Sequence, residues 1–246
     1  MTIDADVDVL RGSFRVRASL HVGDGEVTFV LGPNGSGKTT LLRTIAGLQP
    51  LQGGEIKVGG SVVDSPAAGV FVPPERRECV MVFDDSLLFG RLSVRSNVAF
   101  GLACRGVGRK CARQLADQWL DRMQILPLAT QRPDRLSAGQ AQRVALARAM
   151  ITKPRALLLD EPLAALDVSA RRSTREWLRE QLAEFGGSVV MTTHDPLDAE
   201  EGDTALVIEA GECVQRGVLS DVLSNATTPY VAELARVAAR RAQDGG

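Results

Sequence analysis

The sequence has no surplus of charge of either sign. Its 29 Lys and Arg residues face 30 Asp and Glu residues, so the formal net charge is -1 at pH 7. Proteins that bind nucleic acid through its phosphates usually carry a clear excess of basic residues. The near balance argues against a nucleic-acid partner, although it leaves room for a local basic patch.

Cysteine pairs and long apolar runs are also missing. The four cysteines are scattered and form no C-x-x-C pair, which favours reduced, structural thiols: Cys79, Cys104, Cys111 and Cys213. No apolar stretch approaches the roughly 18 residues that a membrane-spanning helix needs. The first 14 residues are acidic and lack the apolar core of a signal peptide. We therefore expect an intracellular protein that reaches a membrane only through a partner.

Apolar runs alternate with helical patterns along most of the 246 residues. Continuous apolar runs at 27–31, 79–83, 156–160 and 188–194 predict buried strands, and 13–22 alternates like a half-buried antiparallel strand. Between about residues 93 and 151 the period is helical throughout. Strands that alternate with helices predict an α/β fold with a parallel sheet, here interrupted by an inserted helical part.

A glycine-rich loop follows the apolar run at 27–31. GPNGSGKT (32–39) matches G-x-x-x-x-G-K-[ST] between a predicted strand and a predicted helix, which is the context of a phosphate-binding P-loop. Its glycines let successive N–H groups point at phosphate oxygens, and the helix adds its positive N-terminal end. Lys38 is placed to reach the terminal phosphates, and the Thr39 hydroxyl to bind Mg²⁺. The predicted nucleotide-binding residues of the loop are Gly32, Pro33, Asn34, Gly35, Ser36, Gly37, Lys38, Thr39 and Thr40.

Two carboxylates end the apolar run at 156–160. Asp160 suits a Mg²⁺ site, and Glu161 beside it points another way, where it can act as general base toward an attacking water. Alone, Asp-Glu-Pro is more typical of the start of a loop. Together with a P-loop, the pair is better interpreted as part of a catalytic site.

The stretch LSAGQAQRVALARAM (136–150) predicts a helix capped by Ser137. Its Ser-Ala-Gly start is bare enough for a phosphate to approach the helix end. Periodicity alone favours an ordinary capped core helix.

Five motifs in order, GPNGSGKT, LSAGQ, LLLDEP, LAALD and TTH, resemble those of the nucleotide-binding subunit of ATP-binding cassette (ABC) transporters, and the resemblance runs to about residue 220. It implies a P-loop NTPase (RecA-like) core with an antiparallel β subdomain and an inserted helical subdomain. The expected single domain has its core and β subdomain at about 1–84 and 152–225, the helical subdomain at about 85–151 and a final helix at about 229–241. The resemblance also implies ATP hydrolysis with Mg²⁺, in a homodimer that encloses two ATP molecules.

The same resemblance assigns roles to single residues. It makes Glu161 the catalytic base and His194 the residue that contacts the γ-phosphate. Asp167 becomes the residue that communicates across the dimer. The start of the helix at 136–150 would meet the γ-phosphate held by the P-loop of the other subunit, through Ser137, Ala138, Gly139 and Gln140.

One phenylalanine and one histidine near the N-terminus need separate interpretations. The family usually stacks an aromatic residue of the N-terminal strand on adenine, and Phe14 is the nearby candidate. Packing of Phe14 in the β subdomain is an equally good interpretation. His21, in the same strand, is interpreted as structural.

The largest departure from the family pattern is at Asp84. FDDSLLF (83–89) aligns without a gap and puts Asp84 where the family has a glutamine that touches Mg²⁺ and the attacking water. Asp85 then falls at a solvated loop position. A carboxylate about 5 Å from a phosphate charge is repelled by roughly 3 kcal/mol at an effective dielectric near 20, and Mg²⁺ can offset this. Either Asp84 ligates the metal, directly or through water, or the site closes more slowly. Ala138, where the family usually has glycine, is a milder departure.

Two function classes compete. A soluble cassette protein acting on nucleic acid or ribosomes usually carries a second cassette, long coiled coils or zinc modules, none of which fits this sequence. We expect instead the ATPase subunit of a bacterial importer at the cytoplasmic face of the inner membrane. Its partners would be transmembrane permease subunits and, indirectly, a substrate-binding protein.

The stretch at 86–102 is similar to importers of molybdate, sulfate, polyamines, iron and sugars, and the region around the P-loop most resembles the molybdate importer ATPase. Such subunits often have an additional C-terminal β domain, and this chain ends too soon to hold one. The candidates for the permease contact are Leu87, Leu88 and Phe89, with packing inside the helical part as the alternative.

Overall fold

The computed structural model describes residues 2–164, 166, 168–200 and 202–244. The chain divides into two compact units. The first comprises Met1–Met81, Arg155–Glu161 and Leu182–Gly246, and the second comprises Val82–Pro154 and Pro162–Gln181. The subdomain boundaries expected from the sequence stay a prediction.

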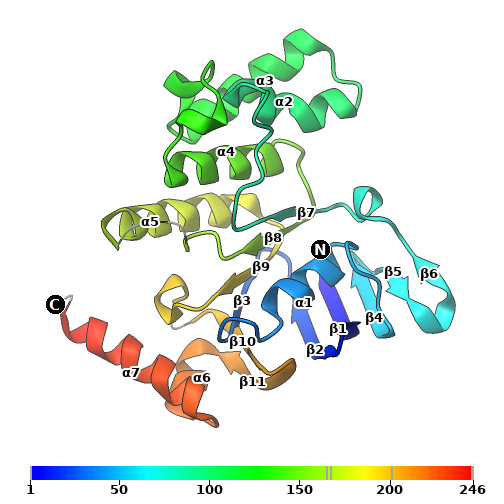
Figure 1. Ribbon diagram of the computed structural model, residues 1–246, viewed down its shortest axis with the longest axis vertical. Helices are drawn as coiled ribbons and strands as arrows, with labels where there is room; N and C mark the ends of the chain where they lie inside the picture. Colours follow the sequence, from blue (N-terminus) through cyan, green and yellow to red (C-terminus); the bar gives the residue numbers. More distant parts are fainter. Residues whose placement is uncertain (1, 165, 167, 201, 245–246) are drawn as a thin grey trace. The chain divides into compact units, whose positions relative to one another are not determined.

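The first unit is built on a mixed sheet (Figure 1), in which the described residues form eleven strands ordered β6-β5-β4-β1-β2-β11-β10-β3-β9-β8-β7. The strands are β1 (Ile3–Arg11), β2 (Phe14–Val22), β3 (Val27–Leu31), β4 (Gly53–Val58), β5 (Ser61–Ser65), β6 (Val70–Phe71), β7 (Cys79–Val82), β8 (Ala156–Asp160), β9 (Ser188–Thr193), β10 (Thr204–Glu209) and β11 (Glu212–Val218).

Strands β3, β8, β9 and β10 form the parallel part of the sheet. Asp160 at the end of β8 is in register with Thr192 of β9, and Thr193 is in register with Leu31 at the end of β3. The carboxyl ends of these buried strands therefore meet at one edge, where ligands of open α/β sheets bind. Helix α1 (Lys38–Ile45) starts at this edge and packs on β8 and β9.

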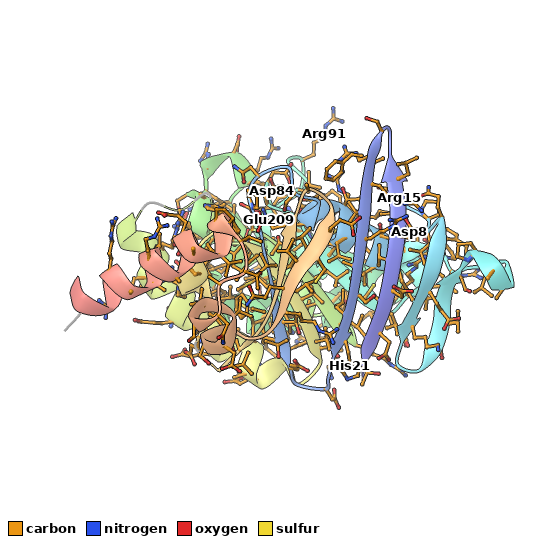
Figure 2. The ribbon with its side chains drawn as sticks, turned by 90° about the horizontal axis from the view of Figure 1, so that it is seen from below. Asp8, Arg15, His21, Asp84, Arg91 and Glu209 are labelled. Atoms are coloured by element: carbon orange, nitrogen blue, oxygen red, sulfur yellow. The ribbon has the colours of Figure 1, made fainter. Side chains whose placement is uncertain are left out.

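The antiparallel part of the sheet contains a strand that the sequence analysis does not predict. In β1 the residues facing the core alternate with acidic ones: Ile3, Ala5, Val7 and Val9 are buried. On the outer face, Arg15 of β2 forms an ion pair with Asp8, and His21 Nδ1 lies 2.5 Å from Asp4 Oδ1 (Figure 2). The hydrogen bond with His21 lowers the pKa of the Asp4 carboxyl. His21 thus pairs within the sheet.

Two further helices follow the last strand of the first unit. Helix α6 (Leu219–Ser224) packs beside α7 (Pro229–Asp244), and α7 also contacts the short turn Pro196–Asp198 that follows β9 (Figure 1). The final helix expected at about 229–241 is confirmed by α7, which starts at the predicted proline.

The second unit is helical. It contains α2 (Val94–Cys104), α3 (Arg109–Arg122) and α4 (Ala138–Met150), with α2 packed on both others, and most of α5 (Val168–Phe185). The helical period predicted for 93–151 is confirmed by these helices. Within the described part of the chain, no helix combines the length and the apolar character needed to cross a membrane.

Candidate functional site

The P-loop curls tightly against the strands around it. Gly37 has φ 113, and a Cβ there would lie 2.8 Å from Val16 Cγ2. A Cβ on Gly32 would lie 2.3 Å from the carbonyl oxygen of Ile208. These two positions exclude any side chain, so the loop backbone can approach a ligand closely.

Lys38 occupies the centre of the loop. Its Nζ donates to the carbonyl oxygens of Gly32 at 2.8 Å and Pro33 at 3.2 Å, and lies 3.2 Å from Glu161 Oε1. The side chain is only 5% exposed. A buried ammonium that is hydrogen-bonded to carbonyls and a carboxylate can bind an anionic ligand whose oxygens replace these partners.

Asp160 is buried behind the loop. Its Oδ1 accepts hydrogen bonds from Thr39 Oγ1 at 3.1 Å and from Thr192 Oγ1 at 2.8 Å. The Thr192 hydroxyl also accepts the backbone N–H of Glu161 at 2.9 Å. One threonine of β9 therefore fixes both residues of the carboxylate pair, and sequence reasoning missed it.

Glu161 turns away from Asp160 because its backbone is left-handed, with φ 43. Such a conformation is uncommon for a residue other than glycine and is often found at functional sites. Its Oε1 meets Lys38, and its Oε2 lies 3.0 Å from His194 Nδ1. The predicted base and the predicted γ-phosphate contact are thus brought together at the end of β8 and β9.

The turn after His194 is held rigidly. Thr193 Oγ1 donates to Asp198 Oδ2 at 2.5 Å and accepts the backbone N–H of Asp195 at 3.0 Å. The residues on either side of His194 are thus tied into the turn, and the hydrogen bond with Glu161 orients the imidazole.

The oxygen atoms of Thr39 and Asp160 fit Mg²⁺, which prefers hard oxygen ligands and keeps several waters or phosphate oxygens. They lie side by side, and Asp160 supplies the negative charge. Among the residues that the structure describes, no group of three or more His, Cys, Asp or Glu side chains could hold a metal by itself. Further ligands would therefore come from a bound nucleotide and water.

Asp84, the third predicted metal ligand, belongs to the second unit. Its carboxylate is exposed to solvent, and Oδ1 accepts the backbone N–H of Asp85 at 3.0 Å. Asp85 is exposed as well. A metal contact of Asp84 stays a prediction.

The predicted phosphate-binding helix start is formed by α4. Ser137 and Gln140 make a reciprocal capping box, with Ser137 Oγ accepting the Gln140 N–H at 3.3 Å. Ala138 is the first helical residue, and its φ is negative, as its substitution for glycine requires. A Cβ added to Gly139 would lie 3.3 Å from Leu166 Cδ2, so Leu166 would have to shift slightly to admit a side chain there. Asp167 lies outside the described residues.

Phe14 lies beside the P-loop. Its Cε1 is 3.4 Å from where a Cβ of Gly37 would be, and the ring also packs against the hydrophobic core. Both interpretations of Phe14, adenine stacking and core packing, therefore stay open.

Two other contacts with the loop escaped sequence reasoning. Gly211, in the turn between β10 and β11, donates its N–H to the carbonyl oxygen of Ser36 at 2.9 Å. Burial raises the pKa of Tyr230, in α7, to about 12, with the Gly32 backbone opposing and the charges of Glu209 and Glu161 adding to the rise.

The model of the ABC transporter family matches residues 16–164. The chain belongs to this family. It is 43% identical over 228 residues to the molybdenum import ATP-binding protein ModC of Mycobacterium tuberculosis (strain ATCC 25618 / H37Rv), covering 91% of this chain and 62% of that protein. It is 40% identical to the spermidine/putrescine import ATP-binding protein PotA of Pseudomonas fluorescens (strain Pf0-1), covering 87% of this chain and 58% of that protein.

The fold agrees with a solved ABC ATPase. The ATP-binding cassette MJ0796, solved as a dimer in a post-hydrolysis state with ADP and Pi, superposes with a TM-score of 0.72 at 27% identity, over 89% of this chain and 98% of the other. The predicted P-loop NTPase fold is thereby confirmed. This ABC chain spans about three fifths of the length of the curated relatives it matches.

Proposed function

We propose that this chain is the ATP-hydrolysing subunit of an ABC importer, which powers uptake through a separate membrane permease. The observation that carries the proposal is the position of Glu161 between Lys38 and His194 at a P-loop. That arrangement joins a phosphate-binding cation, a base and an orienting imidazole within hydrogen-bond distance of one carboxylate.

Binding of ATP would use groups that already point into the loop. The backbone N–H groups of 34–39 and the N-terminus of α1 would receive the phosphates, as helix starts do. Lys38 would exchange its carbonyl and carboxylate partners for phosphate oxygens. Phe14 would stack on adenine from the start of β2.

Hydrolysis would follow at Glu161. Once Lys38 turns to phosphate, the carboxylate is free to accept the proton of an attacking water, while His194 keeps it oriented and reaches the γ-phosphate. Thr39 and Asp160 would hold Mg²⁺, which supplies positive charge to the phosphates. Thr192 keeps Asp160 and the Glu161 backbone in place during the exchange.

We further propose that two copies complete each site. The capped start of α4, Ser137–Gln140, offers backbone N–H groups and a positive helix end to the γ-phosphate held by the other copy. Asp167 would lie at the same interface. The dimeric state of the similar cassette MJ0796 supports this arrangement.

The permease and the cargo are inferred from relatives. Two of the relatives are described as import ATP-binding proteins, for molybdenum in ModC and for spermidine and putrescine in PotA. We take molybdate as the favoured cargo, with sulfate, iron or polyamine as alternatives. The chain would then lie at the cytoplasmic face of the membrane, bound to permease subunits and indirectly to a substrate-binding protein. Leu87 and Phe89, which are 50% and 41% exposed, are the proposed permease contacts.

The test is phosphate release by the purified chain with Mg-ATP, repeated with DNA or RNA added and with a candidate molybdate permease pair. We expect the permease pair to co-purify with the chain, molybdate to alter the rate in that complex, and nucleic acid to leave the rate unchanged. Stimulation by nucleic acid would favour the alternative, an ABC-type ATPase acting on nucleic acid or ribosomes.

A further inference from the structure

The segment Ser86–Phe89 in the second unit has an unusual backbone. Ser86 has φ 58 and Leu87 has φ 39, so two consecutive residues with side chains are left-handed. This region is disfavoured for L residues other than glycine, and a bulky leucine there is a genuine outlier. Such a conformation persists only where the surroundings hold it, which makes those surroundings informative.

Arg148, on helix α4, holds the two outlier residues. Its Nη1 donates to the carbonyl oxygen of Leu87 at 2.8 Å and its Nη2 to that of Ser86 at 2.9 Å. The guanidinium also lies 5.2 Å from the centre of the Phe89 ring. The planar fork thus binds two successive carbonyls and stacks on the next aromatic, which a lysine ammonium cannot do.

Two other side chains complete the clamp. Ser86 Oγ donates to Oε1 of Gln142, which is also on α4, at 3.0 Å. The fully buried Asn97 of α2 binds both backbone groups of Phe89: Oδ1 accepts the N–H at 2.8 Å, and Nδ2 donates to the carbonyl oxygen at 3.1 Å. The segment is therefore fastened to the body of the helical unit by side chains from two helices.

We propose that Arg148 is a positioning residue that locks Ser86–Phe89 to α4, so that this segment and the helix start at Ser137–Gln140 move as one body. Helix α4 is continuous from Ala138 to Met150, with Arg148 in its last turn. A contact made at the exposed Leu87 or Phe89 is thereby carried along a rigid helix to its other end. This inference rests on the proposed function, in which one end meets the permease and the other end meets ATP.

The test is hydrogen–deuterium exchange in Arg148→Lys, with Arg143→Lys as the matched control. Arg143 is also on α4 and donates to a carbonyl, that of Met123, while stacking on Trp177. In the wild type the N–H groups of Ser86, Leu87 and Phe89 are bonded to Phe83 O, Asp85 O and Asn97 Oδ1. We expect Arg148→Lys to speed exchange of 84–90 by about tenfold or more with the protection of α4 unchanged, and Arg143→Lys to leave 84–90 as in the wild type.

A second measurement adds a non-hydrolysable Mg-ATP analogue. We expect the wild type to change its exchange at 84–90 and at 136–142 together, and Arg148→Lys to change only at 136–142. Phe89→Leu keeps both hydrogen bonds from Arg148 to the carbonyl oxygens of Ser86 and Leu87, so it should retain the joint response. It serves as a second variant in case Arg148→Lys fails to fold.

The proposal is overturned if exchange at 84–90 is unaffected by Arg148→Lys, if Arg143→Lys has the same effect, or if both variants loosen the whole of α4. A wild type whose P-loop peptide, 30–40, does not respond to the nucleotide would overturn the proposed function instead. The nucleotide-free comparison would still decide whether Arg148 holds the segment.

Discussion

Two pairs of adjacent carboxylates lie where a strand of the sheet ends. Asp160 and Glu161 follow β8, and Asp84 and Asp85 follow β7. The first pair is tied to a lysine, a histidine and two threonines. The second pair is exposed, and Asp84 Oδ1 accepts the backbone N–H of Asp85.

The difference shows that an apolar run followed by two acids does not by itself predict which contacts the acids make. The two pairs differ in their neighbours at the edge of the sheet. The register of β8 with β9 places Thr192 beside Asp160, and His194, directly after β9, contacts Glu161. The pair after β7 leads instead into the clamped segment Ser86–Phe89. The predictions below separate the two pairs by removing one contact at a time.

The largest effect on nucleotide binding is expected from removing the cation that contacts the first pair. Lys38→Ala should weaken ATP binding by roughly 100-fold, since a hydrogen-bonded charge contributes about 1.5–3 kcal/mol. Equilibrium binding of a fluorescent ATP analogue measures this. Lys57→Ala, which removes an exposed lysine paired with Glu55 on the antiparallel sheet, should bind as the wild type does.

The threonine that joins both residues of the first pair should come next. Thr192→Val removes one hydrogen bond to the buried Asp160 and the hydroxyl that accepts the Glu161 N–H, so we expect a loss of about 1–3 kcal/mol in the free energy of unfolding. Urea denaturation measures the change. Thr28→Val is the control, because the buried Thr28 hydroxyl has no hydrogen-bond partner among the described residues. Equal losses in both variants would contradict the role given to Thr192.

A smaller effect is expected at the second pair. Asp84→Gln restores the family's amide, and we expect the Mg²⁺ concentration for half-maximal ATPase and the rate to shift by about two- to fivefold, since carboxylate and amide oxygens bind Mg²⁺ differently. Asp85→Asn should leave both values unchanged. Identical Mg²⁺ curves and rates for Asp84→Gln and the wild type would remove Asp84 from the site.

The last prediction concerns chemical accessibility, and not activity, in the strand that leads to the second pair. Burial raises the pKa of the Cys79 thiol, in β7, to about 11, although Arg77 opposes this. At pH 8 about one thousandth of it is thiolate, so alkylation should be at least tenfold slower than at the exposed Cys111. Mass spectrometry after timed treatment with iodoacetamide measures both rates, and equal rates would show that β7 is accessible.

Much of this site could be predicted because its chemistry lies in contiguous motifs. The P-loop, Asp160, Glu161 and His194 each follow an apolar strand, and parallel strands bring such ends together. The roles of Thr192 and Gly211 could not be predicted from the sequence. That of Thr192 depends on the register of β8 with β9, and that of Gly211 on the approach of its turn to Ser36 in the P-loop. The clamp of Arg148 on Ser86 and Leu87 joins residues about 60 apart in the chain through backbone carbonyls, which carry no sequence signal.

Strand β1 shows a different limit. Its acidic residues argued against a signal peptide but did not predict a strand, although every second residue is apolar and buried. The outward acids have polar partners on β2: Asp8 pairs with Arg15 (Figure 2), Asp4 with His21, and Asp6 accepts from Ser19 Oγ. Charge on one face of a strand therefore hid the alternation that defines it.

The central claim is that Glu161, after β8, is the general base of the reaction and that Asp85, after β7, takes no part in it. Its most direct test is steady-state phosphate release by the wild type, Glu161→Gln and Asp85→Asn at saturating Mg-ATP. Loss of a general base should lower the rate by about 10²–10⁴-fold in Glu161→Gln, with Asp85→Asn at the wild-type rate. A Glu161→Gln variant that hydrolyses ATP like the wild type, or an equal loss in Asp85→Asn, would contradict it.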